Sequence, residues 1–450
     1  MRIAIVHDWL YTLGGAEKVL SAMLRCFPSA DLFCLFDVLS PEGRAKAGLP
    51  ASRTSFLQRM PAINRRHRLY LPLMPMAVEQ LDLTDYDLII SSSYAVAKGV
   101  LTGPDQLHLS YVHSPMRYAW DLQHQYLRES KLDHGVRSWL ARAMLHKMRL
   151  WDTRTAAGVD AYAANSHFVA RRVRKVYGRD AEVIHPPVEV PETLPRLEAA
   201  VAGEPSFYLA ASRLVPYKNI LSIVEAFKLM PDRRLVVAGS GPELARLRAV
   251  GAPNVVFAGF VPDQELRRLM RAADAFVFAA EEDFGILPVE VQGEGTPVIA
   301  LGRGGLRETV VADGANPTGV FFDRSDAASI AAAVGAFETR KGEFTRAACH
   351  ANAARFRTAT FEARFSEFVH RHYGAFQARL RAGAPPVGAE LGNRIEPDDQ
   401  VGLDDRATYP DRKRHSRSAE WVDPAAAIGR HDAARPEHSE IEQDVSKEYT

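Results

Sequence analysis

Short apolar segments alternate with helix-like segments along most of this 450-residue chain. In the first half, apolar runs occur at 2–6 (RIAIV), 31–36 (DLFCLF) and 86–91 (YDLIIS). They do not alternate apolar with polar residues, which is typical of strands buried on both faces of a parallel sheet. The segments between the runs, such as 134–150 and 166–177, have the length of crossover helices. This pattern predicts a doubly wound α/β domain.

The alternation is interrupted once and then begins again. Five prolines and no apolar periodicity occur between residues 183 and 206, which predicts an interdomain linker at 191–206. Because the same strand–helix pattern then returns, we expect a second doubly wound sheet. Its candidate strands are FYLAAS at 207–212, RLVVAGS at 234–240, NVVFAGF at 254–260 and AFVFAA at 275–280.

The 450 residues divide into four predicted parts besides the linker. Residues 1–190 and 207–357 are the two Rossmann-like domains. Residues 358–383 form one amphipathic helix whose aromatic and aliphatic stripe should pack back on the body. Residues 384–450 are rich in charge and proline, with few apolar clusters. Such a composition buries too little apolar surface to offset chain entropy, which predicts a disordered tail.

Composition limits the partners and the compartment. The formal net charge of +1 gives no general attraction to nucleic acid. Cys26, Cys34 and Cys349 lack metal-ligand spacing, and an odd number of cysteines argues against a disulfide framework, so we expect a reducing compartment. The chain enters a strand at once, which leaves no room for a signal peptide, and no apolar run reaches the length of a membrane span. We therefore expect a cytoplasmic protein.

Two cations follow the first strand of the second domain, in ASRLVPYKN. Arg213 leaves that strand, and Lys218 comes after a proline-containing turn where the next helix begins. Charge-assisted hydrogen bonds and the unpaired N–H groups of a helix start both favour a diphosphate. A solvated pair on a loop is the alternative interpretation.

Two glutamates frame a Phe-Gly step in EEDFGILPVE at 281–290. Glu282 follows an apolar strand, and Glu290 lies on the helix that comes next. Carboxylates offer several acceptor positions and therefore suit sugar and ribose hydroxyls, while the N–H groups of residues 284–286 are expected to be unpaired. A single acid near a helix start can instead stabilise the helix dipole.

These segments, in this order, resemble the retaining family 4 glycosyltransferases, which have the GT-B fold of two Rossmann-like domains facing a cleft. The stretch from Glu282 to Glu290 resembles the E-x7-E signature of the family, and SRLVPYKN resembles its phosphate-binding segment. ANSHFVARRVRKVYGRDAEVIHPPV at 164–188 is similar to the segment that closes the N-terminal domain. The resemblance covers about residues 1–382.

The resemblance implies roles for residues of the second domain. Arg213 and Lys218 would hold the donor diphosphate. Glu282, with the backbone of Phe284, Gly285 and Ile286, would contact the transferred sugar. In the family's nucleotide-domain turns, which FAGFVPDQEL resembles, Val261 would contact the base. Glu290 would bind the ribose.

The resemblance implies two further sites in the first domain. Gly14 and Gly15 would bring the backbone close to the phosphates and the sugar. His113, in YVHSPMRYAWD, follows a predicted strand and would face the reacting centre. A core histidine with satisfied hydrogen bonds is the alternative for His113.

The expected activity is transfer of a hexose from a nucleotide-diphosphate sugar, which is a substrate, without a cofactor or a required metal. HDWLYTLGGAEKVL and VPYKN look closest to mannosyltransferase-like members, which favours GDP-mannose. The expected acceptor is a saccharide or a polyprenyl-linked saccharide in exopolysaccharide or lipopolysaccharide biosynthesis. The alternatives are a sugar-nucleotide epimerase or a phosphorylase on the same fold, or a non-catalytic interaction subunit.

Two basic segments also contain large apolar side chains. Residues 56–75 combine four arginines with leucine, tyrosine and methionine, and residues 135–151 combine cations with Trp139 and Trp151. This combination suits an anionic membrane surface, which predicts peripheral contact with the inner face of the membrane. A solvated helix face or the lining of an acceptor site is the alternative.

Overall fold

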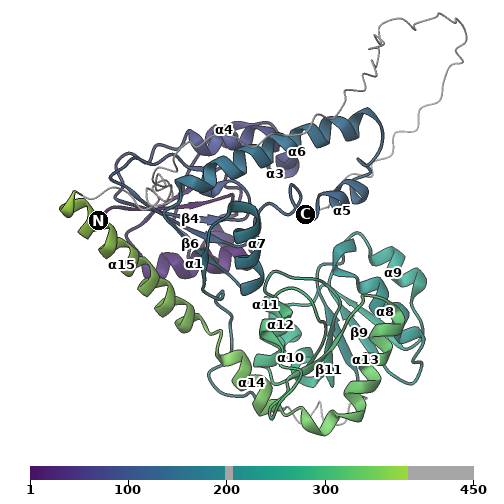
Figure 1. Ribbon diagram of the computed structural model, residues 1–450. Helices are drawn as coiled ribbons and strands as arrows, with labels where there is room; N and C mark the ends of the chain where they lie inside the picture. The colour runs from purple at the N-terminus through teal and green to yellow at the C-terminus, as the bar shows by residue number, and fades with distance from the viewer. Residues whose placement is uncertain (198–205, 384–450) are drawn as a thin grey trace, which may run out of the picture. The chain divides into compact units, whose positions relative to one another are not determined.

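The computed structural model describes residues 1–197 and 206–383 (Figure 1). Within these ranges the strands form two sheets, and all the strand pairs in both sheets are parallel. This arrangement confirms the predicted class of two doubly wound α/β sheets. The predicted tail at 384–450 and residues 198–205 of the predicted linker lie outside the described residues.

The first sheet has the strand order β3-β2-β1-β4-β5-β6-β7. Its central strands are buried along their whole length, as their unbroken apolar runs predict. Its strands are β1 (Ile3–His7), β2 (Asp31–Cys34), β3 (Ser52–Thr54), β4 (Leu88–Ser93), β5 (Leu107–Val112), β6 (Ala161–Ala164) and β7 (Ala181–Val183).

Helices of the first domain begin and end where the sequence supplies caps. In α7, the Ser166 hydroxyl accepts a hydrogen bond from the Val169 N–H at 3.0 Å, and Gly178 ends the helix with φ of 64°. Both residues adopt these cap positions because they satisfy backbone groups that a helix end leaves unpaired. The helices are α1 (Gly15–Cys26), α2 (Pro41–Ala47), α3 (Ile63–Arg66), α4 (Met74–Glu79), α5 (Gln123–Glu129), α6 (Gly135–Thr155) and α7 (His167–Tyr177).

The second sheet has the strand order β10-β9-β8-β11-β12-β13. Its strands are β8 (Tyr208–Ala211), β9 (Leu235–Ala238), β10 (Val255–Gly259), β11 (Ala275–Phe278), β12 (Val298–Leu301) and β13 (Gly319–Phe322). The helices that accompany it are α8 (Ile220–Lys228), α9 (Leu244–Val250), α10 (Asp263–Ala272), α11 (Ile286–Gly293), α12 (Leu306–Thr309), α13 (Ala327–Thr339) and α14 (Arg346–Ala354).

Each sheet has one point at which the strand order reverses direction. In the first sheet it lies between β1 and β4, and in the second it lies between β8 and β11. Chains leave such neighbouring strands toward opposite faces, so the loops at their carboxyl ends separate and leave room for a ligand. The candidate residues Arg213 and Glu282 follow β8 and β11. The topology therefore places them at the expected binding edge of the second sheet.

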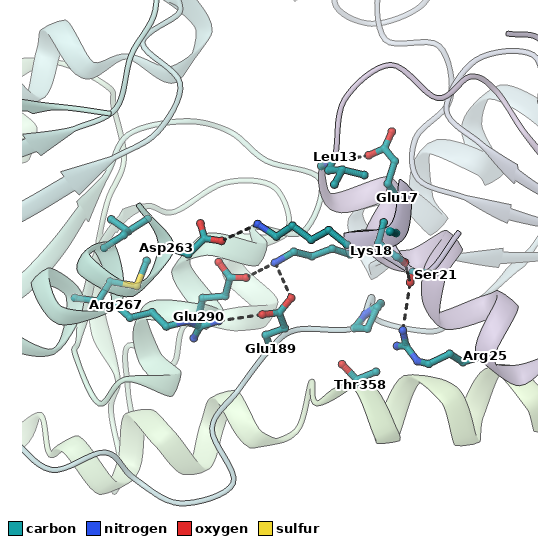
Figure 2. Close-up of a pocket in the computed structure, with 18 residues that line it drawn as sticks. Leu13, Glu17, Lys18, Ser21, Arg25, Glu189, Asp263, Arg267, Glu290 and Thr358 are labelled. Carbon is teal, nitrogen blue, oxygen red and sulfur yellow. Dashed lines mark hydrogen bonds and ion pairs between the residues drawn. The ribbon is translucent and has the colours of Figure 1, made fainter. Parts of the chain in front are cut away.

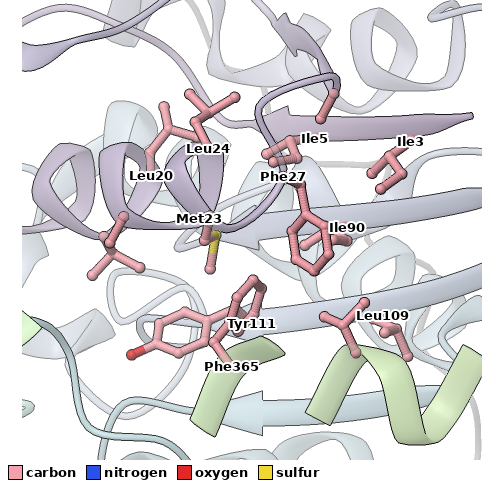
Figure 3. Close-up of a cluster of buried hydrophobic side chains, with 14 of the residues drawn as sticks. Ile3, Ile5, Leu20, Met23, Leu24, Phe27, Ile90, Leu109, Tyr111 and Phe365 are labelled. Carbon is pink, nitrogen blue, oxygen red and sulfur yellow. The ribbon is translucent and has the colours of Figure 1, made fainter. Parts of the chain in front are cut away.

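The long helix α15 (Thr358–Ala382) follows the second domain in sequence but packs on the first sheet. Its phenylalanines at 361, 365 and 368 are buried, at the helical spacing that puts side chains on one face. Figure 3 shows Phe365 beside Phe27 and Tyr111, with ring centroids 6.2 Å from each. Each buried phenylalanine contributes about 1.5–3 kcal/mol. The helix thus ties the end of the described chain to the first domain.

The other face of the first sheet is covered by α4 and α6, which share one hydrophobic cluster. Lys98, after β4, is 1% exposed and lies 2.7 Å from the Asp152 carboxylate of α6. Burial lowers the pKa of Lys98, and the charge of Asp152 opposes that shift. Trp120 donates a hydrogen bond from its indole nitrogen to the same carboxylate at 2.7 Å. This buried pair fixes α6 on the sheet.

Candidate active site

The loop that carries Arg213 is held by close backbone contacts. The Leu214 N–H donates a hydrogen bond to the Ser240 carbonyl at 2.8 Å. Gly239 has φ of 138°, and a Cβ there would lie 1.9 Å from the Ser212 carbonyl oxygen. Only glycine fits this approach. The Arg213 side chain is exposed, and its guanidinium donates a hydrogen bond to the Tyr217 hydroxyl at 3.2 Å.

Lys218 and Glu282 form an ion pair with each other. Their side chains are 16% and 19% exposed, so both remain accessible from one side. The Lys218 ammonium also lies 5.6 Å from the centre of the Phe278 ring, at the end of β11. The structure therefore brings together the cation predicted for phosphate and the carboxylate predicted for the sugar.

The Phe-Gly step between the two glutamates has separate roles for its side chain and its backbone. The Phe284 side chain is 3% exposed and packs against the rings of His185 and Phe356, at centroid distances of 5.5 and 5.3 Å. Gly285 has φ of 92°, and a Cβ there would lie 2.5 Å from a Leu306 methyl group. The side chain is thus committed to packing, which leaves only the backbone at 284–285 for a ligand.

The glycine pair of the first domain touches the same helix start. A Cβ on Gly15 would lie 2.7 Å from the Cδ1 atom of Ile286, the first residue of α11. Gly15 begins α1, and the Gly14 N–H donates a hydrogen bond to Glu17 at 2.8 Å. The absence of a side chain at Gly15 therefore allows α1 and α11 to approach closely. The backbones at the starts of these two helices are both predicted to contact the donor.

Glu290 is paired across the two domains. Its carboxylate lies 2.8 Å from the Lys18 ammonium of α1, which also lies 3.3 Å from Glu189 (Figure 2). Arg267 of α10 contacts Glu189 from the other side at 3.1 Å. Burial opposes the charged form of Lys18, but the charges of Glu290 and Glu189 raise the pKa of Lys18 above its usual value.

A cavity of about 690 Å³ adjoins this ion-pair network (Figure 2). Gly14 and Glu290 line it, together with Asp263, which lies two residues after Val261. Arg213, Lys218, Glu282 and His113 do not line it. The predicted ribose residue Glu290 and the predicted phosphate and sugar residue Gly14 therefore both line this cavity, whereas the predicted base residue Val261 does not. Its lining residues are Leu13, Gly14, Glu17, Lys18, Ser21, Arg25, Ala45, Lys46, Ala47, Gly48, Pro187, Glu189, Asp263, Leu266, Arg267, Met270, Glu290 and Thr358.

A chain of polar contacts connects His113 with the glycine pair. The Ser92 hydroxyl lies 2.8 Å from the His113 Nε2 atom and 3.0 Å from the His7 Nδ1 atom. The His7 Nε2 atom lies 3.7 Å from Glu17, which accepts the Gly14 N–H. Burial, and secondarily the nearby His7, lowers the pKa of His113 to about 3. His113 is therefore neutral at physiological pH.

Three further residues were not predicted from the sequence. Arg172 of α7 donates a hydrogen bond to Asp283 at 2.6 Å, and Arg117 lies 3.4 Å from the same carboxylate. Burial raises the pKa of Asp283, and the two arginines oppose that shift. The three successive acids at 281–283 were a signal that a cation would be needed close to them. Nothing in the sequence indicated which arginine supplies it.

Within the two described stretches, no group of three or more histidine, cysteine, aspartate or glutamate residues is arranged to hold a metal ion. Among the helices of these same stretches, none is both long and apolar enough to cross a membrane.

Two doubly wound domains, with a lysine–glutamate ion pair at the second switch point, form the architecture expected of a nucleotide-sugar transferase. The family model "Glycosyltransferase Family 4" matches residues 13–191, and "Glycosyl transferases group 1" matches residues 196–356. Together these matches cover more than half of the chain. The chain therefore belongs to the group 1, family 4 glycosyltransferases, as its motifs predict.

Two similar curated proteins are mannosyltransferases. The GDP-mannose-dependent alpha-(1-6)-phosphatidylinositol monomannoside mannosyltransferase of Mycolicibacterium smegmatis is 30% identical over 219 residues, which are 43% of this chain and 56% of the relative. The GDP-mannose-dependent monoacylated alpha-(1-6)-phosphatidylinositol monomannoside mannosyltransferase of Corynebacterium glutamicum is 30% identical over 194 residues, which are 37% of this chain and 50% of the relative. The chain thus spans about half the length of these curated relatives.

Among solved structures, Anabaena HepE in complex with UDP matches with a TM-score of 0.59 and 19% identity. The match covers 82% of this chain and 100% of that chain. At this identity the likeness concerns the fold alone, and it agrees with the two-domain GT-B arrangement.

Proposed function

We propose that this protein is a retaining hexosyltransferase that uses a nucleotide-diphosphate sugar without a metal ion. The observation that carries the proposal is the contact between Lys218 and Glu282 at the switch point of the second sheet. A ligand with an anionic group beside a hydroxylated ring matches this pairing of a cation with a carboxylate. Family membership supports the reaction class.

In the proposed reaction, the bond between the anomeric carbon and the donor phosphate oxygen breaks, and its electron pair stays on the diphosphate. Arg213, Lys218 and the N–H groups where α11 begins stabilise that negative charge. The acceptor hydroxyl attacks the same face of the sugar, and its proton passes to a donor phosphate oxygen. Glu282 stabilises the positive charge that develops on the sugar, and neutral His113 contacts the sugar from the first domain.

The donor we favour is GDP-mannose, with Glu290 on the ribose and Val261 near the base. Two relatives carry GDP-mannose in their names, although the solved HepE structure contains UDP. The cavity beside Glu290 supports a nucleoside position at this end of the site. A screen that measures release of GDP or UDP from GDP-mannose, GDP-glucose, UDP-glucose and UDP-galactose tests the assignment. Faster release from a UDP-sugar would contradict it.

The acceptor we favour is a lipid-linked saccharide of a bacterial surface polysaccharide, reached at the inner face of the membrane. Each of the segments 56–75 and 135–151 contains four lysine or arginine residues and no acid. Leu69 is 72% exposed, and on α6 Trp139 and Leu140 are 69% and 56% exposed. Exposed apolar side chains with surrounding cations suit an anionic lipid surface.

Sedimentation with phosphatidylglycerol vesicles tests the membrane contact. Wild-type protein should bind these vesicles more strongly than phosphatidylcholine vesicles, and binding should weaken as salt increases. Trp139→Ala with Arg137→Glu should reduce binding, whereas Arg248→Glu on α9 should not. Equal binding to both lipids would contradict the proposal.

The rival enzymes need different substrates. An epimerase would act on the nucleotide sugar without an acceptor, and a phosphorylase would depend on inorganic phosphate. Transfer that requires an acceptor but not phosphate distinguishes the proposed activity from both. A non-catalytic subunit would release no nucleotide under any of these conditions.

A further inference from the structure

Two adjacent residues before α7 bind the backbones of two loops that belong to different domains. The Asn165 side chain donates a hydrogen bond to the His113 carbonyl at 2.9 Å. The Ser166 hydroxyl donates one to the Asp283 carbonyl at 2.6 Å. His113 follows β5 of the first sheet, and Asp283 follows β11 of the second. One short segment therefore fixes the loops that carry His113 and Glu282.

Arg172, on α7 itself, repeats this bridge with its side chain. Its Nη1 group donates hydrogen bonds to Asp283 at 2.6 Å and to the Ser114 hydroxyl at 3.1 Å. Its Nε group donates to Asp121 at 3.0 Å. The rigid fork of a guanidinium can serve several acceptors at once, which a lysine cannot. One cation thus contacts both the neighbour of His113 and the neighbour of Glu282.

The bridge is largely shielded from water. The side chains of Arg172 and Asp283 are each 12% exposed. At the start of the same helix, Glu308 of α12 accepts the N–H groups of His167 and Phe168 at 2.9 Å each. A charge-assisted contact with low exposure is strong and holds its geometry. The second domain is therefore fixed to α7 by two carboxylates, those of Asp283 and Glu308.

We propose that Asn165, Ser166 and Arg172 are positioning residues that set the distance between His113 and Glu282. This proposal rests on the proposed function, in which those two residues face the transferred sugar from opposite domains. Neither reacting group touches the other directly, so their relative position depends on a third element. A displacement of about 1 Å between groups that act on one bond can lower a rate about 10²-fold. Arg172 is the member whose loss should have the largest effect.

Steady-state kinetics on Arg172 variants test the proposal, with GDP-mannose and UDP-glucose as the donor probes. Arg172→Ala should lower kcat about 10²-fold and leave the donor KM nearly unchanged, since no donor-binding group is removed. Arg172→Lys keeps the charge but loses the fork, and should recover only part of kcat. Arg171→Ala is the matched control, because Arg171 is exposed on the same helix and lies over the Phe168 ring.

Hydrogen exchange gives a readout that does not depend on activity. In Arg172→Ala, amides at 110–118 and at 279–287 should both exchange faster, while the melting temperature stays close to that of the control. Faster exchange confined to α7, or an unchanged kcat in Arg172→Ala, would overturn the proposal. A wild-type protein that releases no nucleotide from any of the four screened donors in the presence of acceptor would refute the proposed function instead, and the exchange result would still decide the role of Arg172.

Discussion

The two sheets place an acid near the switch point in chemically opposite ways. After β1, Asp8 is fully buried, and its carboxylate accepts four successive backbone N–H groups, those of residues 94–97, at 2.6–3.0 Å. After β11, Glu282 is partly exposed and pairs with the Lys218 side chain. A ligand can replace a side-chain partner, but it cannot replace four backbone donors without unfolding them. The acid beside the first switch point is therefore structural, whereas the acid beside the second has a side-chain partner that a ligand could replace.

The two sites also differ in the accessibility of their charged groups. Burial raises the pKa of Asp8, an effect that its backbone hydrogen bonds oppose, and lowers that of nearby His113 to about 3. His113 is thus neutral, and the Asp8 carboxylate is fully occupied by backbone donors. The second domain presents an ammonium and a carboxylate. Of these groups, only Lys218 and Glu282 of the second domain are charged side chains that remain partly exposed.

Removing the Lys218 ammonium, which a ligand could separate from Glu282, should have the largest effect on activity. Lys218→Ala should lower kcat/KM by orders of magnitude, since loss of one partner from a desolvated charged site costs about 2–5 kcal/mol. Arg213→Ala should act in the same direction. The melting temperature should change little, because both side chains lie at the surface of the site. Donor turnover and thermal melting measure the two effects separately.

Lys228→Ala is the control for this prediction, because it removes an exposed lysine at the end of α8. Near-normal turnover in Lys218→Ala would show that the ion pair with Glu282 is structural. The contrast between the two switch points would then disappear.

Substitution of the buried Asp8 should instead reduce stability, whereas substitution of Lys218 should reduce activity. Asp8→Ala should lower the free energy of unfolding by about 3 kcal/mol or more, because several buried N–H groups lose their acceptor. Chemical denaturation measures this loss. Asp85→Ala is the control, since Asp85 is 81% exposed. An unchanged midpoint in Asp8→Ala would mean that residues 94–97 find other acceptors.

The two glutamates of the second domain should be distinguishable from each other. Glu282→Gln should lower kcat, because positive charge develops on the sugar in the transition state. Glu290→Gln should mainly raise the donor KM, because the ribose is remote from the breaking bond. Each change removes a charged hydrogen-bond acceptor, which costs about 1.5–3 kcal/mol. Kinetics with saturating acceptor decide between them, and the reverse pattern would exchange the two assignments.

The sequence predicted those features that depend on local pattern. Unbroken apolar runs predicted both sheets, and the proline-rich stretch before residue 207 marked the change from one sheet to the next. The segment from Glu282 to Glu290 was singled out because its acids stand at a strand end and on the following helix. Short strands such as β3 and β13 were not predicted, since a run of three or four residues carries little periodicity.

The part of the site that could not be predicted from the sequence consists of contacts between residues distant in sequence. Lys18 and Glu290 are 272 positions apart, and Arg172 and Asp283 are 111 apart. No local pattern identifies such pairs, because the sequence gives the type of a side chain but not its partner. Glu290 was predicted for ribose, and its contact with Lys18 adds a cation that a donor would meet there. The roles of both glutamates stay predictions.

The smallest expected effect concerns the neutral histidines of the first sheet. Among the described residues, no strand of the second sheet contains a histidine, so this effect belongs to the first sheet. His108, on β5, is fully buried, and burial lowers its pKa to about 4. The unfolded chain therefore binds the proton first as pH falls. The contribution of neutral His108 to the free energy of unfolding is fully present above about pH 6.5 and is lost as pH decreases toward 4.

At pH 5 this linkage costs about 2 kcal/mol for one such histidine. His108→Asn should therefore lose less stability than the wild type between pH 7 and pH 5, whatever its stability at pH 7. His146→Gln, at an exposed position on α6, should keep the wild-type pH dependence. Denaturation at the two pH values measures the difference. If His108→Asn and the wild type lost stability in parallel, the acid sensitivity would arise from groups other than His108. This result would contradict the lowered pKa of His108.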